Sequence, residues 1–108
     1  MSPQVFSTLA EPNRFHIVEL LRSKPRSVNE IADTLKLHQP QVSKHLKVLA
    51  DAGVVNVTPN KNKHMYALKS QPFKELDTWL QKYRVLWEER FDRLDLLLQK
   101  GVIKDGRK

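Results

Sequence analysis

Apolar positions in the first half of the chain recur every three or four residues, which is the spacing of one face of an α-helix. The first such stripe lies within residues 13–23 and consists of Phe15, Ile17, Val18, Leu20 and Leu21. Asn13 follows Pro12 and is expected to cap this helix. Pro25 is expected to end it, because the residue before a proline disfavours the α-helical conformation.

A second and shorter helical pattern begins at Ser27. Ser27 and Glu30 have the spacing of a capping box, in which each side chain accepts a hydrogen bond from the other residue's backbone. The pattern predicts a helix within residues 27–35. Its inward side chains are expected to be Val28, Ile31, Ala32 and Leu35.

A third helical pattern covers residues 39–53 and follows a tight connection. Pro40 fits the first turn, where its missing N–H is not needed, and Gly53 is a typical terminator. The buried face is expected to hold Val42, Leu46, Val48 and Leu49. Two short helices with a tight connection, the second opening with exposed polar groups, are typical of a helix-turn-helix.

After Gly53 the chain changes to short stretches rich in β-branched and aromatic residues. Residues 54–58 (VVNVT) and 64–68 (HMYAL) predict two strands, separated by residues 59–63. A hairpin directly after a helix-turn-helix is a wing. The expected fold class is therefore mainly α with a small β-hairpin, a winged helix-turn-helix in which the three short helices and the two strands precede a final long helix.

The longest helical pattern covers residues 72–99, where apolar steps of three and four come close to a heptad seam. The stripe consists of Phe73, Leu76, Leu80, Tyr83, Trp87, Phe91, Leu94 and Leu98, widened by Trp79, Leu86 and Leu97. This width suits a helix that packs on its own domain and on a partner subunit. The expected dimer interface is Trp79, Tyr83, Trp87, Phe91 and Leu94. Trp79, Tyr83 and Trp87 could also line a ligand pocket at this interface.

The 108 residues allow one compact domain. Residues 1–99 are expected to form it, with the helix at about 72–99 serving for dimerisation, and residues 100–108 are expected to be a flexible basic tail. No apolar run approaches the roughly 20 residues that cross a bilayer, and the N-terminus lacks the pattern of a signal peptide. We therefore expect a cytoplasmic protein without membrane insertion.

The charge balance suggests a polyanionic partner. Nineteen Lys and Arg against twelve Asp and Glu give a formal net charge of +7, which favours nucleic acid or an acidic membrane surface. The absence of cysteine excludes disulfides, thiolate metal sites and cysteine nucleophiles. No glycine-rich phosphate loop and no grouping of Ser, His and acid is present, so we expect no enzyme and no cofactor.

Polar side chains on the third helical pattern and in the hairpin suggest which polyanion is bound. With the apolar face of residues 39–53 inside, the outward side chains are Gln39, Gln41, Ser43, Lys44 and Lys47. Glutamine pairs with adenine edges, and lysine with guanine or phosphate, as on a recognition helix in the major groove. The hairpin adds Lys61, Lys63 and His64, which suit the DNA backbone or minor groove. Double-stranded DNA is therefore the expected partner.

At this point the sequence resembles a known family. The run HQPQVSKHLKVLADAGVV, followed by a short basic hairpin and MYAL, is similar to the ArsR/SmtB family of bacterial repressors. The opening FSTLAEPNRFHIVELL is similar to the first helices of that family. The segment FKELDTWLQKYRVLWEERFDRLDLLL is similar to a metal-independent branch of it. The resemblance covers nearly the whole chain, and its QPQVSKHLKVL motif is highly specific.

The resemblance implies one further helix at the start of the chain, so that four helices, two strands and a final helix follow in that order. It also implies a dimer of this winged helix-turn-helix, joined through its first and last helices. Members bind an imperfect palindrome near their own promoter and commonly repress it. The resemblance adds His45 to the expected DNA contacts. One departure is His38, which stands where the family usually has a serine cap. Histidine is a poor cap, and whether His38 contacts phosphate is open.

Metal sensing is the best-known activity of the family. One family site uses cysteines in the short helix before the recognition helix, where this chain has Ser27 and Asn29. Another uses Asp, His and Glu along the final helix, which here has acidic residues but no histidine. The four histidines, His16, His38, His45 and His64, are scattered over different elements. Transition-metal sensing is therefore not expected.

Three alternatives remain beside a sequence-specific repressor. A ligand- or metal-responsive sensor predicts an effector that weakens DNA binding by a coupling of about 1–3 kcal/mol. A protein-interaction module predicts partner binding without a DNA footprint. A non-specific nucleic-acid-binding protein predicts equal affinity for any duplex and a steep dependence on salt.

Overall fold

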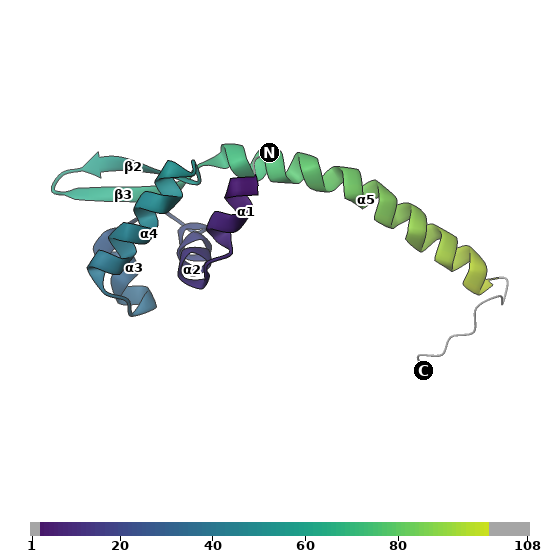
Figure 1. The fold of residues 1–108 in the computed structure, drawn as a ribbon, viewed down its shortest axis with the longest axis horizontal. Helices are drawn as coiled ribbons and strands as arrows, with labels where there is room; N and C mark the ends of the chain where they lie inside the picture. The colour runs from purple at the N-terminus through teal and green to yellow at the C-terminus, as the bar shows by residue number, and fades with distance from the viewer. Residues whose placement is uncertain (1–2, 100–108) are drawn as a thin grey trace. The chain divides into compact units, whose positions relative to one another are not determined.

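The computed structural model describes residues 3–99 (Figure 1). The expected tail at residues 100–108 lies outside the described residues. The chain divides into two compact units, of which the first ends at Glu75 and the second begins at Leu76. The elements are α1 (Pro3–Leu9), α2 (Pro12–Leu21), β1 (Arg26–Ser27), α3 (Val28–Leu35), α4 (Gln39–Asp51), β2 (Val55–Asn60), β3 (Lys63–Leu68) and α5 (Ser70–Gln99).

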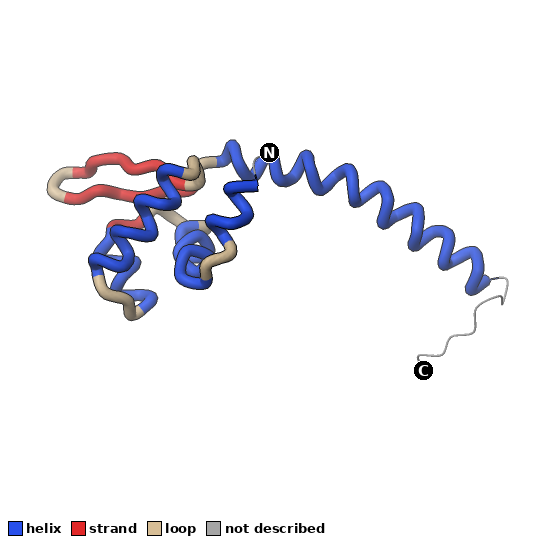
Figure 2. Tube along the Cα trace, in the orientation of Figure 1, coloured by secondary structure: helices blue, strands red, loops and turns tan. Residues whose placement is uncertain are grey.

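The predicted fold class is confirmed, since the described residues are mainly helical and carry one small antiparallel sheet (Figure 2). The sheet has three strands in the order β1-β3-β2, whereas the sequence predicted two. The additional strand is β1, where Arg26 pairs with Tyr66 and Ser27 with Met65. A two-residue strand carries no alternating pattern, so only its pairing with β3 reveals it.

The wing is a longer hairpin than predicted, with a shorter turn. Its register runs from Val55 opposite Leu68 to Asn60 opposite Lys63, so only Lys61 and Asn62 form the turn. The expectation that residues 59–63 separate the strands is therefore wrong. Pro59 is accommodated because β2 is an edge strand, where proline is tolerated. Lys61 adopts a left-handed φ of 59°, which a tight hairpin turn requires and which glycine or asparagine adopts more readily.

Helix α2, which was expected within residues 13–23, begins one residue earlier, at Pro12. Asn13 was expected to cap α2, but the N-cap is Glu11, whose Oε1 accepts a hydrogen bond from the Arg14 backbone N–H at 2.9 Å. Pro12 then occupies the first helical position, where its fixed φ is favourable and its missing N–H is not needed. Asn13 is thus a residue of the first turn.

The capping box of α3 is confirmed. The Glu30 N–H donates to Ser27 Oγ at 3.2 Å, and the Ser27 N–H donates to Glu30 Oε1 at 2.8 Å. At its other end, α3 is closed by Lys36 in the left-handed conformation, with φ 57° and ψ 47°. Glycine usually occupies such a position. Lys36 therefore begins the turn of the helix-turn-helix.

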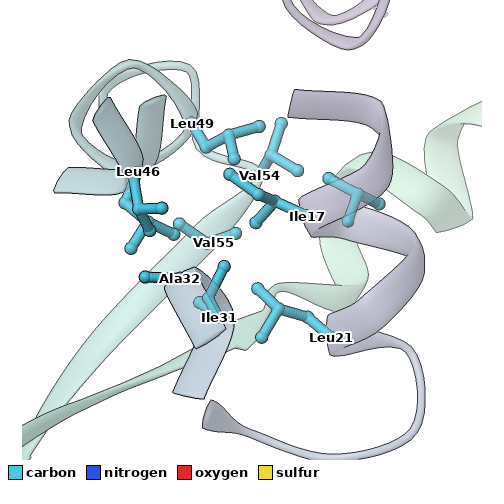
Figure 3. Close-up of a cluster of buried hydrophobic side chains, with 10 residues drawn as sticks. Ile17, Leu21, Ile31, Ala32, Leu46, Leu49, Val54 and Val55 are labelled. Atoms are coloured by element: carbon cyan, nitrogen blue, oxygen red, sulfur yellow. The ribbon is translucent and has the colours of Figure 1, made fainter. Parts of the chain in front are cut away.

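The core of the first unit joins α2, α3, α4 and the start of β2 (Figure 3). Its fully buried side chains are Ile17, Ile31, Val42, Leu46, Leu49, Val54 and Val55. Two residues expected in the apolar stripes are not buried, since Phe15 is 49% exposed and Val48 is 37% exposed. Each lies about a third of a turn from the centre of its helix's buried face. Short helices that contact the core on one side bury only a narrow face.

The ionised Glu11 carboxylate is expected to stabilise the fold at neutral pH. The hydrogen bond from the Arg14 backbone N–H, with help from the charge of His45, lowers the pKa of Glu11 below its usual value of 4.5. A lowered pKa means that this contribution is present at neutral pH and is lost as the pH falls through the folded-state pKa. Glu11→Gln should therefore lower the midpoint of thermal unfolding by a few degrees at neutral pH, and the difference should vanish in acid.

Thermal unfolding followed by circular dichroism at about pH 7 and about pH 3 checks this expectation. Glu19→Gln is the matched control, because Glu19 is exposed on the same helix. Its carboxylate lies 3.8 Å from the Arg22 guanidinium, and an exposed ion pair of this kind contributes little to the free energy of unfolding. A difference for Glu11→Gln that stays the same at both pH values would contradict the assignment.

The long C-terminal helix is confirmed as α5, which begins at Ser70 rather than at residue 72. Pro72 lies in its first turn, where proline is tolerated. Phe73 packs against the core of the first unit. From Leu76 onward, large apolar side chains remain exposed: Trp79, Tyr83, Val85, Leu86, Trp87, Phe91 and Leu94.

Candidate nucleic-acid interface

Helix α4 divides its side chains between the core and solvent. Val42, Leu46 and Leu49 are fully buried and fix the rotation of the helix. The polar side chains expected to read DNA, Gln39, Gln41, Ser43, Lys44 and Lys47, are all exposed. The burial of one face thus presents amide, hydroxyl and ammonium groups on the other, all of which can bind base edges or phosphates.

Two of these polar side chains also make contacts on their own helix. Gln41 Oε1 accepts a hydrogen bond from the His38 backbone N–H at 3.3 Å, which leaves the amide NH₂ of Gln41 as a donor. Lys47 Nζ lies 3.6 Å from Asp51 Oδ2, and both side chains are largely exposed. An exposed pair of this kind contributes little to stability, so Lys47 can exchange Asp51 for a phosphate at low cost.

The two histidines near α4 have different surroundings. His38 is exposed at the N-cap, and its side chain makes no capping hydrogen bond. His45 is half-buried, and its Nδ1 is buried without a hydrogen-bond partner among the described residues. The charge of His45 helps to lower the pKa of Glu11, the N-cap of α2, and α2 and α4 share the core of the first unit. A DNA contact by His45 stays a prediction.

The wing presents its basic side chains to solvent. Lys61, Lys63 and His64 are exposed at or beside the turn of the hairpin. Lys61 occupies the left-handed turn position, while Lys63 and His64 begin β3. The positive charge of the wing therefore gathers at its tip, as expected for a contact with the DNA backbone.

An open groove of about 320 Å³ joins the start of α3, helix α4 and the wing. It brings together three of the predicted residues, Ser43, Lys63 and His64. The residues that complete its lining are Ser27, Val28, Asn29, Asn62 and Tyr66. Neither Asn29 nor Asn62 was among the DNA contacts expected from the sequence. The pairing of β1 with β3 brings the start of α3 to the wing, and no sequence pattern indicated that pairing.

Glu30 lies close to this groove without lining it. The hydrogen bond from the Ser27 backbone N–H is the main cause that lowers the pKa of Glu30, and the charges of Lys24 and Lys63 lower it further. Glu30 is therefore ionised at neutral pH and places a negative charge at the start of α3, beside the groove.

The apolar side chains expected at a dimer interface are exposed on α5. Trp79, Tyr83, Trp87, Phe91 and Leu94 are 38%, 41%, 49%, 66% and 37% exposed. The rings of Trp79 and Tyr83 pack against each other with centroids 5.0 Å apart. Large exposed apolar surfaces commonly mark sites of association, so the exposure agrees with the expected role without assigning a partner.

The described residues lack two further features. No cluster of three or more His, Cys, Asp or Glu side chains within residues 3–99 could hold a metal ion. No described helix is both long and apolar enough to span a membrane.

Comparisons with known proteins give consistent results. Residues 9–58 match a protein family described as a helix-turn-helix domain. The chain is 42% identical over 65 residues to the transcriptional repressor SmtB of Mycobacterium tuberculosis, an alignment that covers 60% of this chain and 48% of that protein. It is 35% identical over 80 residues to the transcriptional regulator Rv2034 of M. tuberculosis, covering 74% of this chain and 75% of that protein. The match thus spans about half of SmtB and three quarters of Rv2034.

The fold is shared with solved structures of the same kind. A crystal structure of an ArsR family transcriptional regulator superimposes with a TM-score of 0.69 at 28% identity, and the match covers 79% of this chain and 93% of that protein. The crystal structure of M. tuberculosis Rv0081 gives a TM-score of 0.60 at 36% identity, and this match covers 82% of this chain and 88% of that protein.

Proposed function

Because the chain belongs to the ArsR/SmtB family of winged helix-turn-helix transcriptional regulators, we propose that it is a sequence-specific repressor that binds its operator as a homodimer. The observation that carries the proposal is the exposed polar face of α4 beside the basic wing. The operator is a pseudo-palindrome near the protein's own gene, and occupation of this site in the cytoplasm blocks the promoter.

The recognition helix in this proposal is α4. Its exposed glutamine and lysine side chains hydrogen-bond to base edges in the major groove, where Gln suits adenine and Lys suits guanine. The wing lysines, Lys61 and Lys63, contact the backbone and supply affinity that does not depend on sequence. Specificity thus comes mainly from α4, and much of the affinity comes from the wing and the net charge of +7.

The homodimer in this proposal is held by α5 together with α1. The exposed apolar side chains of α5 gain stability when a second copy covers them. A two-fold symmetric dimer presents two recognition helices about one DNA turn apart, roughly 34 Å, which matches a palindromic operator. SmtB of M. tuberculosis is a named repressor, and this similarity supports repression as the outcome of binding.

A fluorescence-anisotropy titration with labelled DNA from directly upstream of the gene tests the proposal. A scrambled duplex of the same length and two salt concentrations serve as controls. We expect tight binding to the native fragment and clearly weaker binding to the scrambled one. Equal binding to both, lost together as salt rises, would leave a non-specific nucleic-acid-binding protein instead.

Lys44→Ala is expected to lower affinity for the native duplex by about tenfold or more, because it removes a predicted contact to a base edge. Affinity for the scrambled duplex should fall less, so discrimination between the two should decrease. Lys82→Ala, which removes the same charge from an exposed position on α5, is the control for net charge. Wild-type affinity and discrimination in the Lys44→Ala protein would remove Lys44 from the recognition set.

A further inference from the structure

We propose that the groove between α3, α4 and the wing binds one phosphate of the DNA backbone, with Asn29 and Asn62 as contacts in addition to Lys63 and His64. This inference rests on the proposed DNA binding and adds a contact from α3, outside the recognition helix and the wing tip. The groove is the place where these three elements meet.

The lining of the groove has the chemistry of a phosphate site. Lys63 supplies a positive charge, and the two asparagine amides and the Ser43 hydroxyl supply hydrogen-bond donors. His64 adds a further nitrogen donor, and none of the residues that line the groove is acidic. A phosphodiester offers only acceptor oxygens and a negative charge, so it complements this set of donors.

The shape of the groove favours DNA backbone over an enclosed small molecule. Its volume of about 320 Å³ lies at the lower end for ligand pockets, and it is broadly open to solvent. Small-molecule sites are commonly concave and mostly apolar, whereas this groove is lined mainly by polar side chains. An open polar groove suits a strand that passes across it.

The position of the groove gives the contact a role in orientation. Ser43 belongs to the recognition helix, Asn62 and Lys63 to the wing, and Asn29 to the first turn of α3. One phosphate held by all three elements fixes the distance between the recognition helix and the DNA backbone. Such contacts set the register of a protein on DNA without reading its sequence.

Glu30 opposes this phosphate through its charge. Its carboxylate accepts a hydrogen bond from the Ser27 backbone N–H at 2.8 Å, and both Ser27 and Asn29 line the groove, so a negative charge lies beside the proposed phosphate. Removal of the Glu30 charge should therefore strengthen DNA binding, although Glu30 itself need not touch DNA.

Asn29→Asp is the direct test. It places a negative charge in the groove with almost no change of shape, and aspartate in the first turn of a helix favours the helix, so a loss of binding will not come from unfolding. Asn56→Asp is the matched control: Asn56 is exposed on β2 and pairs with Ala67, so alternation places it on the opposite face of the sheet from Tyr66.

Glu30→Gln is the complementary test, because glutamine preserves a capping box while it removes the charge. Glu19→Gln is its control, with the same charge change on α2. Together the two pairs separate the charge of the groove from the net charge of the protein.

Anisotropy titrations of all four variants against the native and the scrambled duplex give the readout. We expect Asn29→Asp to lower affinity for both duplexes by about tenfold relative to Asn56→Asp, with the ratio between the duplexes unchanged. The slope of the logarithm of the association constant against the logarithm of the salt concentration should decrease in magnitude by about one, which corresponds to the loss of one phosphate contact. Glu30→Gln should raise affinity for both duplexes about threefold relative to Glu19→Gln.

Three results would overturn the inference. Equal affinities of Asn29→Asp and Asn56→Asp, while the wild type binds DNA, would exclude the groove and leave the proposed function intact. A loss confined to the native duplex would show that Asn29 reads bases rather than phosphate. Failure of the wild type to bind any duplex would refute the groove contact and the proposed function together.

A fourth result would separate the two proposals. If the wild type binds both duplexes equally and Asn29→Asp still weakens binding to both, the groove contact holds and only the operator proposal fails.

Discussion

Trp87→Asp is expected to dissociate the proposed homodimer and to lower operator affinity by at least about a hundredfold. Trp87 is 49% exposed in the single chain and lies in the apolar stripe of α5, where a second copy would cover it. An aspartate there places an unpaired charge in an apolar interface on each subunit, which costs several kcal/mol. A monomer then binds only one half-site. Sedimentation equilibrium and the operator titration measure the two effects.

Val85→Asp is the matched control for this prediction. Val85 is 57% exposed and lies two residues before Trp87, which places it nearly opposite on the same helix, about 200° away. The same new charge on that side should leave the dimer and its operator affinity unchanged. A Trp87→Asp protein that remains dimeric would move the interface away from this stripe, and a dissociated Val85→Asp protein would place the interface on the other side of α5.

Leu46→Ala is expected to lower the free energy of unfolding by about 2–5 kcal/mol, a large part of the stability of a domain of this size. Leu46 is fully buried where α4 packs against α2, α3 and the start of β2 (Figure 3). Truncation removes apolar contacts and leaves a cavity beneath the recognition helix. Urea denaturation followed by circular dichroism measures the change. The slope of the unfolding free energy against urea concentration should stay constant, while the urea concentration at the midpoint should fall.

Val48→Ala tests whether that loss is specific to the buried face of α4. Val48 lies on the same helix, two residues further along, but its side chain is 37% exposed. Its truncation should change the free energy of unfolding by less than about 1 kcal/mol. Equal losses for the two variants would mean that α4 packs on its neighbours with a different rotation from the one described.

The helix-turn-helix was predictable because its signals are local. The capping box of Ser27 and Glu30 and the terminator Gly53 each depend on residues a few positions apart. The buried face of α4 followed from its spacing, except that Val48 was assigned to the core. Hydrophobicity alone does not show how wide a buried face is, because that width depends on which elements cover the helix.

The groove was not predictable, because it depends on contacts between distant parts of the chain. Asn29 and Asn62 are far apart in sequence and share a surface only because β1 pairs with β3. A two-residue strand is stabilised by its partner and leaves no pattern of its own. Lys63, His64 and Ser43 were recognised singly from their chemistry, but nothing in the sequence placed them around one groove.

The two lysines with left-handed backbone place stability and charge in opposition. Lys36 closes α3 with φ 57°, and Lys61 turns the wing with φ 59°. Each side chain in this conformation costs about 1 kcal/mol relative to glycine, which adopts it freely. A glycine at either position would relieve the strain of the left-handed backbone, but it would also remove a positive charge. At position 36 this charge lies in the turn before the recognition helix, and at position 61 it lies at the wing tip. Glycine at these two positions therefore favours folding stability, whereas lysine favours attraction to a polyanion. A substitution at either position is expected to increase one of these two properties and decrease the other.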